Sequence, residues 1–236
     1  MQYIPIKTRI MQPPKDDLFE ILEESLTDVQ ENDVIAISSK VVAIHEGRCV
    51  PIENQDKETL VRQESDMTIP RPYWNTPLTV RHHAFVGAAG IDESNADGHY
   101  VYLPEDPFRS AKKIWSYLKE KHTVKNIGVL ISDSHSTPMR RGATGISIGW
   151  WGFEPIINHV GEDDLFGREM KIEVTNLVDG MASGANLVMG ETNECCPIVV
   201  LRDMPKLTFT DENTKDKLMV PFEEDTFRTL YERFLS

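Results

Sequence analysis

The chain has 236 residues, 40% of them hydrophobic and 27% charged, a composition typical of a globular protein with a sizeable core. Its 38 acidic and 25 basic residues give a formal net charge of −13, which argues against a broad basic face for nucleic acid. Three cysteines, no amino-terminal apolar signal segment and no apolar run of ~20 residues argue against a disulfide framework and a membrane span, so we expect a cytoplasmic protein.

Apolar periodicity and breaker residues predict an alternation of strands and helices. The expected strands cover residues 1–10, 33–37, 41–44, 100–103, 127–131, 170–177 and 198–201. The expected helices cover residues 16–26, 56–64, 108–121, 178–189 and 223–235. Residues 67–80, with three prolines and the bulky Tyr73 and Trp74, are expected to form a loop. The last helix is expected to bury Phe227, Leu230, Tyr231 and Phe234.

The stretch 126–149 contains the strongest chemical signals. Its apolar run predicts a buried strand that stops at Ser132-Asp133-Ser134. A carboxylate and a hydroxyl at the carboxyl end of a buried strand suit a hard cation, which prefers oxygen ligands. Arg140 and Arg141 follow, and they suit phosphate oxygens because guanidinium presents a fixed fork of donors. A strand that ends in an Asx turn, followed by two solvent-facing arginines, explains the same residues equally well.

Asp92 and Glu191 resemble Asp133, because each stands beside hydroxyl or amide side chains where an apolar or small-residue segment ends. Three such carboxylates, far apart in the sequence, could converge on a divalent ion that bridges nucleotide phosphates. The chain has no P-loop, no G-x-G-x-x-G and no H-E-x-x-H motif. A nucleotide-dependent enzyme with this sequence would therefore use an uncommon phosphate cradle.

Five segments, in chain order, stand out together. They are Ser39-Lys40-Val41-Val42 with Glu46-Gly47-Arg48; Ala89-Gly90-Ile91-Asp92-Glu93-Ser94-Asn95; Leu103-Pro104-Glu105-Asp106-Pro107; Ile131-Ser132-Asp133 with Arg140-Arg141-Gly142 and Ile148-Gly149; and Asp164-Leu165-Phe166-Gly167-Arg168-Glu169 with Leu187-Val188-Met189-Gly190-Glu191. Together they resemble the coenzyme F-420:L-glutamate ligase (F-420-0:gamma-glutamyl ligase) family, whose enzymes add γ-linked glutamate to the deazaflavin coenzyme.

This resemblance implies an α+β fold, a two-part mixed α/β fold that forms an intertwined homodimer. It implies a ligase-like domain of two interleaved subdomains over residues 1–204. Residues 205–236 lie beyond the resemblance, and we expect them to form a linker and a carboxyl-terminal amphipathic helix. It also implies GTP as co-substrate, together with Mn²⁺ or Mg²⁺.

The family's functional residues fall on positions of this chain that match its motifs. The resemblance implies the metal ligands Asp92, Asp133, Ser134 and Glu191. It implies nucleotide contacts at Lys7, Thr8, Arg9, Ile10, Ser38, Ser39, Lys40, Asn95, Met189, Gly190, Glu191 and Thr192. We assign Arg140 and Arg141, and after them Arg168, to a phosphate or a substrate carboxylate.

The expected activity joins L-glutamate to a carboxylate acceptor, coenzyme F-420 or a related metabolite, through an acyl phosphate. Two alternatives remain open. The family usually has a lysine where this chain has Ile44, so the fold could bind a nucleotide or metabolite without catalysis. A metal-dependent phosphohydrolase built on Asp92 and Asp133 would hydrolyse nucleotide without any acceptor.

Overall fold

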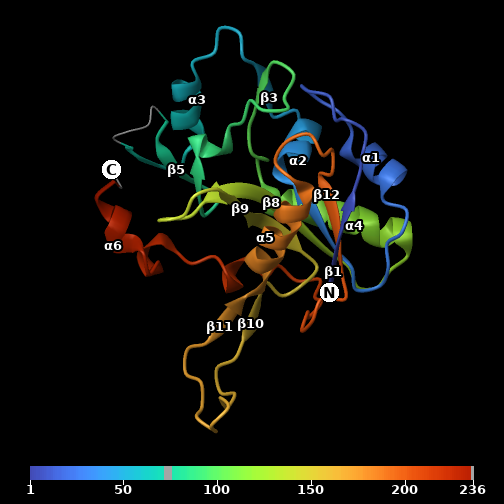
Figure 1. Cartoon of the computed structure of the whole chain (residues 1–236), viewed down its shortest axis with the longest axis vertical. Helices are drawn as coiled ribbons and strands as arrows, with labels where there is room; N and C mark the ends of the chain where they lie inside the picture. The colour runs from blue at the N-terminus through green and yellow to red at the C-terminus, as the bar shows by residue number, and fades with distance from the viewer. Residues whose placement is uncertain (72–75, 235–236) are drawn as a thin grey trace.

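The computed structural model describes residues 1–71 and 76–234 and shows a mixed α/β fold around a five-stranded sheet (Figure 1). The strands of this sheet are β1 (Gln2–Ile6), β2 (Val34–Ser38), β8 (Gly128–Ser136), β9 (Ala143–Trp151) and β12 (Ile198–Arg202). Their order is β1-β12-β2-β8-β9. β2 and β8 are parallel, and the other neighbouring strands are antiparallel.

Helices cover both faces of this sheet. The helices are α1 (Leu18–Ser25), α2 (Ser39–Glu46) and α4 (Pro107–His122) on one face, and α5 (Leu177–Met189) on the other. Successive side chains of a strand point to opposite faces, so Ile35 and Ile37 of β2 pack with α1, α2 and α4, whereas Val34 and Ala36 pack with α5. A strand buried on both faces needs a continuous apolar run, as β2 has.

A second part of the fold is built from small elements with their own apolar cluster around Val61 and Tyr100. The elements are β3 (Cys49–Pro51), α3 (Lys57–Glu64), β4 (Met67–Ile69), β5 (Leu78–Arg81), β6 (Ala84–Gly87), the 3₁₀ turn η1 (Ala88–Gly90) and β7 (His99–Val101). A two-stranded arm, β10 (Ile156–Asn158) and β11 (Val174–Asn176), projects away from the sheet (Figure 1). No helix within the described ranges is both long and apolar enough to cross a membrane.

Most predicted elements are present, but the extended conformation expected for residues 41–44 is wrong. These residues lie inside α2, which ends at Gly47 with a positive φ of 73°. The run Val41–Ile44 is buried on nearly all sides, and such a short apolar run fits a strand and a buried helix equally well. In the structure this run is a helix that packs in the apolar core shared by α1, α4 and the sheet.

Strand β8 is longer than the apolar run predicted. It continues through the polar residues to Ser136, because β9 pairs with it from Val129 to Ser136 and satisfies its backbone groups there. The pairing shifts register between Ile131 and Ser132, where the apolar residues end. Asp133 therefore lies within a β-hairpin and not in a turn after the strand.

Two other predictions differ from the structure. Residues 67–80 contain β4 and β5, which pair with each other, although residues 72–75, including Tyr73 and Trp74, lie outside the described part. The continuous helix expected over residues 223–235 is absent from the described residues of this segment. A 3₁₀ turn (Phe222–Glu224), a four-residue helix α6 (Arg228–Tyr231) and a second turn (Glu232–Phe234) replace it. Tyr231 is buried, but Phe227 and Leu230 are exposed, and the Phe234 side chain and Leu235 lie outside the description.

Candidate functional site

The polar segments assigned to the site meet at the edge of the five-stranded sheet where the strands β2 and β8 have their carboxyl ends. β2 and β8 both run toward this edge, where Ser38 pairs with Ser132. β12 begins there, because Ile198 pairs with Ile37, and β1 ends beside it, because Ile6 pairs with Ile198. The edge therefore brings together residues 7–10, 38–40, 132–134 and 189–197.

Asp133 and Asp92 both contact the first turn of α2. The Ser39 hydroxyl donates to Asp133 Oδ1 at 2.9 Å, and the Lys40 ammonium donates to Asp92 Oδ2 at 2.6 Å. Burial raises the pKa of Asp133 to about 6, although the hydrogen bonds from the Ser39 hydroxyl and the Ser134 backbone act to lower it. The nearby Asp92 charge also raises this pKa, and the Lys40 charge lowers it. The two carboxylates and one ammonium group thus lie close enough to affect one another's charge.

The loop that follows η1 surrounds Asp92 with donors. Oδ1 accepts the backbone N–H groups of Glu93 at 2.7 Å and Ser94 at 2.9 Å, and Oδ2 also accepts the Ser94 hydroxyl at 2.8 Å. Burial acts to raise the pKa of Asp92, but the hydrogen bonds from Lys40 and Ser94 outweigh it and leave the pKa lowered. Asp92 is therefore held as an anion.

The donor set at this edge fits a hard divalent cation. Asp92 and Asp133 offer carboxylate oxygens, and the Lys40 ammonium already places one positive charge on Asp92. Mg²⁺ is commonly held by one or two protein carboxylates together with waters and substrate phosphates, so two carboxylates suffice. The described residues contain no preformed group of three acidic, histidine or cysteine ligands.

Two predicted metal ligands do not join Asp92 and Asp133 in this structure. The Glu191 carboxylate is exposed and accepts a hydrogen bond from Asn186 Nδ2 at 2.6 Å. Ser134 follows Asp133 in a regularly paired part of β8, so its side chain points to the opposite face of the strand. A role for Glu191 requires that its side chain leave Asn186.

The predicted nucleotide segments lie beside the carboxylates. The Thr8 backbone N–H donates to the carbonyl of Cys195 at 3.0 Å, and Asn95 Nδ2 donates to the carbonyl of Thr192 at 2.8 Å. Ser38 is the N-cap residue of α2 but makes no capping hydrogen bond with its side chain. Because a helix N-terminus attracts anions, the start of α2 is suited to a phosphate. Arg9 is already paired with Asp16 at 2.6 Å.

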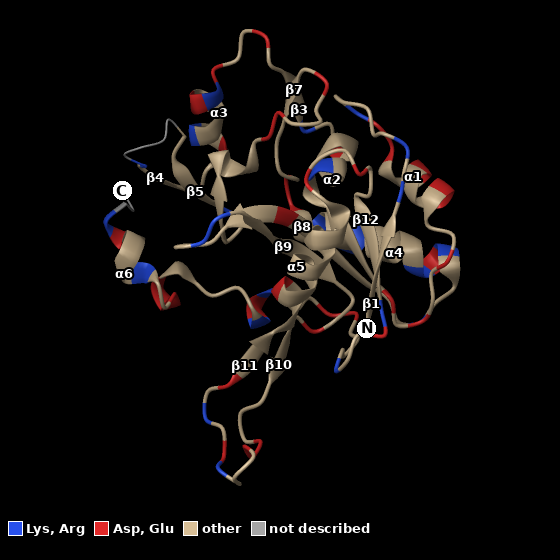
Figure 2. Cartoon of the chain, viewed as in Figure 1, with Lys and Arg blue, Asp and Glu red and all other residues tan. Residues whose placement is uncertain are grey.

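Arg140 and Arg141 lie away from the carboxylates. Both are exposed in the loop between β8 and β9 (Figure 2). The hairpin remains paired for three residues beyond Asp133, to Ser136, which places the arginines ~10 Å or more from it along the strand. Arg168 lies in the loop that connects β10 to β11, at the outer end of the arm.

Two contacts of the site had no signal in the sequence, namely Ser39 with Asp133 and Lys40 with Asp92. Each joins residues that are far apart in the chain. The residues Gly145–Gly149 also match the pattern G-x-S-x-G. Ser147 is buried within β9, however, and not at a turn between strand and helix, so it is not a nucleophile elbow.

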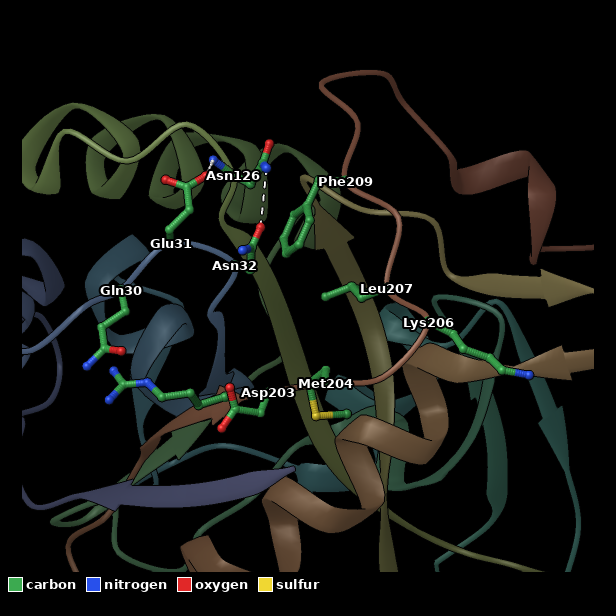
Figure 3. A pocket seen from close by; sticks show the side chains of 10 residues that line it. Gln30, Glu31, Asn32, Asn126, Asp203, Met204, Lys206, Leu207 and Phe209 are labelled. Atoms are coloured by element: carbon green, nitrogen blue, oxygen red, sulfur yellow. Dashed lines mark hydrogen bonds between the residues drawn. The ribbon is translucent and has the colours of Figure 1, made fainter.

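A cavity of about 600 Å³ lies at the opposite edge of the sheet (Figure 3). Two hydrogen bonds join residues that line it: Asn126 Nδ2 donates to Asn32 Oδ1 at 3.2 Å, and Glu31 accepts the backbone N–H of Asn126 at 2.7 Å. None of the predicted site residues lines it. The cavity is therefore separate from the predicted site residues.

The raised pKa of Asp133 predicts a pH dependence of folding stability in metal-free buffer. The folded pKa is about 6 and the ordinary value is 3.8, so the folded state holds the proton more tightly. This contribution is complete below pH ~4 and is lost as the pH rises through ~6, on the order of 2 kcal/mol. Denaturant unfolding of wild type and Asp133→Asn at pH 4 to 7 should show the loss in wild type only. If the free energies of unfolding of the two proteins changed in parallel with pH, the raised pKa of Asp133 would be contradicted.

Comparison with known proteins yields several matches. A family model described as F420-0:Gamma-glutamyl ligase matches residues 5–203. The chain is 33% identical over 227 residues to the coenzyme F420:L-glutamate ligase of Methanopyrus kandleri, covering 85% of each chain. It is 34% identical over 220 residues to that of Methanococcus maripaludis, covering 92% of this chain and 87% of the relative. It is 44% identical over 155 residues to that of Methanocaldococcus jannaschii, covering 65% and 61%.

Proposed function

Because the chain belongs to the F420-0:gamma-glutamyl ligase family and is thus an amino-acid ligase, we propose that it joins L-glutamate to a carboxylate acceptor, coenzyme F420 or a related metabolite, at the expense of GTP. The observation that carries this proposal is the meeting of Asp92, Asp133 and Lys40 at the start of α2. A carboxylate resists attack by an amine and must first be activated. In the proposed reaction the acceptor carboxylate attacks the γ-phosphate and GDP leaves. The amine of glutamate then attacks the acyl phosphate, an amide forms and phosphate leaves.

We propose that Asp92 and Asp133 hold Mn²⁺ or Mg²⁺, with Glu191 as a further ligand once it leaves Asn186. When bound, the cation would neutralise charge on the nucleotide phosphates. Ser38, Ser39 and the first backbone N–H groups of α2 orient the phosphates, because they lie at the positive end of the helix dipole. The loops of residues 7–10 and 189–192, linked through Cys195 and Asn95, bind the rest of the nucleotide.

Arg140 and Arg141 are proposed to bind an anionic group of the acceptor. They are exposed at the end of the hairpin, while Asp133 lies further along the same strand. An acceptor that reached from the arginines to Asp133 would place one anionic group at each end. Two adjacent basic residues suit an anionic group in a chain whose formal net charge is −13.

The substitution of Ile44 for the family lysine does not argue for loss of catalysis. Ile44 is 2% exposed and belongs to the apolar core that α2 forms with α1 and the sheet. A charged side chain there would have to be buried or reach out of the core. Lys40, and not position 44, supplies the ammonium group that contacts Asp92.

The proposal predicts that phosphate release will depend on all substrates. Purified protein is incubated with GTP, Mn²⁺, L-glutamate and a coenzyme F420 acceptor, and products are analysed by mass spectrometry and phosphate assay. Phosphate release together with a product heavier by one or more glutamyl units supports the ligase. Phosphate release without acceptor supports a phosphohydrolase instead, and nucleotide binding without turnover supports a catalytically altered family member. ATP in place of GTP tests the choice of nucleotide.

We further propose a homodimer in which the β10–β11 arm packs on the partner subunit. Leu165 and Phe166, in the loop between β10 and β11, are 98% and 95% exposed, and Ile172 is also exposed. Adjacent apolar side chains on a projecting arm are typical of an interaction surface. The three free cysteines fit a reducing compartment, which supports the cytoplasmic location that we propose.

The arm predicts the effect of a charged substitution on assembly. Phe166→Asp should weaken the dimer by at least about 100-fold, because each of two symmetric copies loses ~1.5–3 kcal/mol of apolar burial. Light scattering across micromolar concentrations measures this. Met139→Asp is the matched control, since Met139 is equally exposed but lies in the loop between β8 and β9. A dimer that Phe166→Asp leaves intact would exclude the arm as the contact.

A further inference from the structure

We propose that the Lys40 ammonium group occupies Asp92 when no nucleotide is bound, and that it must move onto the nucleotide before Asp92 can hold a divalent cation. The cation and the nucleotide would then bind cooperatively, with Lys40 as the group that couples them. This inference rests on the nucleotide- and metal-dependent ligase proposed above. Its evidence is the set of contacts that Asp92 and Lys40 make.

The first observation is that the Asp92 carboxylate has no vacant acceptor position. Oδ1 accepts two backbone N–H groups, from Glu93 and Ser94, and Oδ2 accepts the Ser94 hydroxyl and the Lys40 ammonium. A carboxylate offers about four lone-pair positions, and all four are used. A divalent cation that binds Asp92 must therefore displace one of these donors.

Lys40 is the donor that can leave. The two backbone N–H groups belong to the same tight loop as Asp92, and the Ser94 hydroxyl lies on that loop as well. Lys40 reaches Asp92 from α2 through a flexible four-carbon stem. Its ammonium and a divalent cation also cannot share Oδ2 at close range, because like charges repel.

Lys40 is fully engaged where it lies. Its Nζ is 2.6 Å from Asp92 Oδ2, 2.8 Å from the Ser94 carbonyl and 3.3 Å from the Ser94 hydroxyl. An ammonium group has three donors, so none remains for a phosphate in this position. Lys40 can thus contact the Asp92 loop or a phosphate, but not both with its full set of donors.

A phosphate bound at the start of α2 would give the Lys40 ammonium group a second position. Lys40 belongs to the first turn of α2, whose N-terminus has no side-chain cap. That end of the helix attracts phosphate, and a phosphate there offers oxygens to the same ammonium group. Binding of a nucleotide would therefore draw Lys40 away from Asp92 and free Oδ2 for the cation. Reciprocity of linked equilibria then requires that the cation strengthen nucleotide binding.

The test is calorimetric titration of Mn²⁺ into the nucleotide-free full-length chain, comparing wild type with Lys40→Met. The variant removes the ammonium group and keeps an unbranched side chain. We expect Mn²⁺ to bind about 10-fold or more tightly to Lys40→Met than to wild type. We also expect GTP to increase Mn²⁺ affinity by a larger factor in wild type than in the variant, because only wild type has a lysine for the nucleotide to draw off Asp92; an equal factor in both would overturn the coupling. Lys40→Gln, a second neutral side chain, replaces the first variant if thermal melting shows that it is unfolded.

Lys57→Met is the matched control. Lys57 Nζ lies 3.9 Å from Glu93 Oε2, beside the same loop, but it does not contact Asp92. Removing this charge alters the local electrostatic potential without vacating Oδ2, so Mn²⁺ affinity should change less than about 2-fold. An equal gain in both variants would show a general charge effect and overturn the proposal.

The other possible results of the titration also support or overturn the proposal. If Lys40→Met binds Mn²⁺ no more tightly than wild type, or neither binds it, Lys40 does not restrict the cation site and the inference fails. The ligase assay above is independent of this result, since wild-type activity with GTP and Mn²⁺ tests the proposed function alone. Tighter Mn²⁺ binding in Lys40→Met without any ligase activity in wild type would support the exchange and refute the function.

Discussion

Asp133→Asn is expected to abolish Mn²⁺-dependent GTP binding and ligase turnover, with a loss of at least about 100-fold. Asp133 is one of the two carboxylates that meet at the start of α2. Asparagine has the same shape and retains an oxygen that can accept the Ser39 hydroxyl, so the fold should remain intact. What it removes is the negative charge that a divalent cation needs.

The measurement is calorimetric titration of GTP with and without Mn²⁺, followed by the product assay. Asp97→Asn is the control, because Asp97 is exposed on the segment that follows Asp92 and carries the same charge. Its removal should leave GTP affinity within about 2-fold. Unchanged Mn²⁺-dependent GTP binding in Asp133→Asn would exclude Asp133 as a cation ligand and leave Asp92 without its partner.

Arg202→Met is expected to lower the free energy of unfolding by about 3–5 kcal/mol, or the melting temperature by roughly 6 to 20 °C. Arg202 at the end of β12 forks onto Asp33 with distances of 3.0 and 2.8 Å. Asp33 is 1% exposed, so the loss of Arg202 leaves a buried carboxylate without its countercharge. Methionine fills a similar volume but cannot neutralise it.

Asp28→Asn is the matched control for this prediction. Asp28 also pairs with Arg202, at 3.0 Å, but its side chain is 71% exposed. The hydrogen bond from Arg202, followed by that from Gln30, lowers the pKa of Asp28, yet solvent screens this pair, so Asp28→Asn should destabilise the fold far less than Arg202→Met does. Equal destabilisation by both variants, measured by denaturant unfolding at pH 7, would show that burial does not decide the strength of this network.

The Arg202–Asp33 pair and the Asp92–Asp133 cluster lie at opposite edges of one sheet, and they differ in whether their charged groups can bind a further ligand. Arg202 and Asp33 satisfy each other with paired, short hydrogen bonds, so they stabilise the junction of β12 and β2. Asp133 has Ser39 as its hydroxyl donor, and Asp92 is paired with Lys40, the group that we propose to exchange for a cation. A site that must bind charged ligands is expected to hold its charges incompletely matched or exchangeable, as the carboxylate edge does.

The sequence alone determined those features that depend on local pattern. The apolar run of β2, the capped helices α1 and α3 and the amphipathic α4 each satisfy their own hydrogen bonds or bury one recognisable face, so their type follows from periodicity and capping residues. The motifs around Asp92, Asp133 and Glu191 also predicted the family, which the comparisons confirm. These residues could be recognised in the sequence because each is an acidic residue at the end of an apolar or small-residue segment.

Only the tertiary structure decided the features that depend on residues distant in the chain. Residues 41–44 form part of a helix although their short apolar run fits a strand equally well, and β8 continues through Asp133 because β9 pairs with it. The contact of Lys40 with Asp92 exists only because the loop after η1 folds against the start of α2. Periodicity reports which side of an element is apolar, but it does not report which element lies opposite. The family was therefore predictable from sequence, whereas the partner of each charge was not.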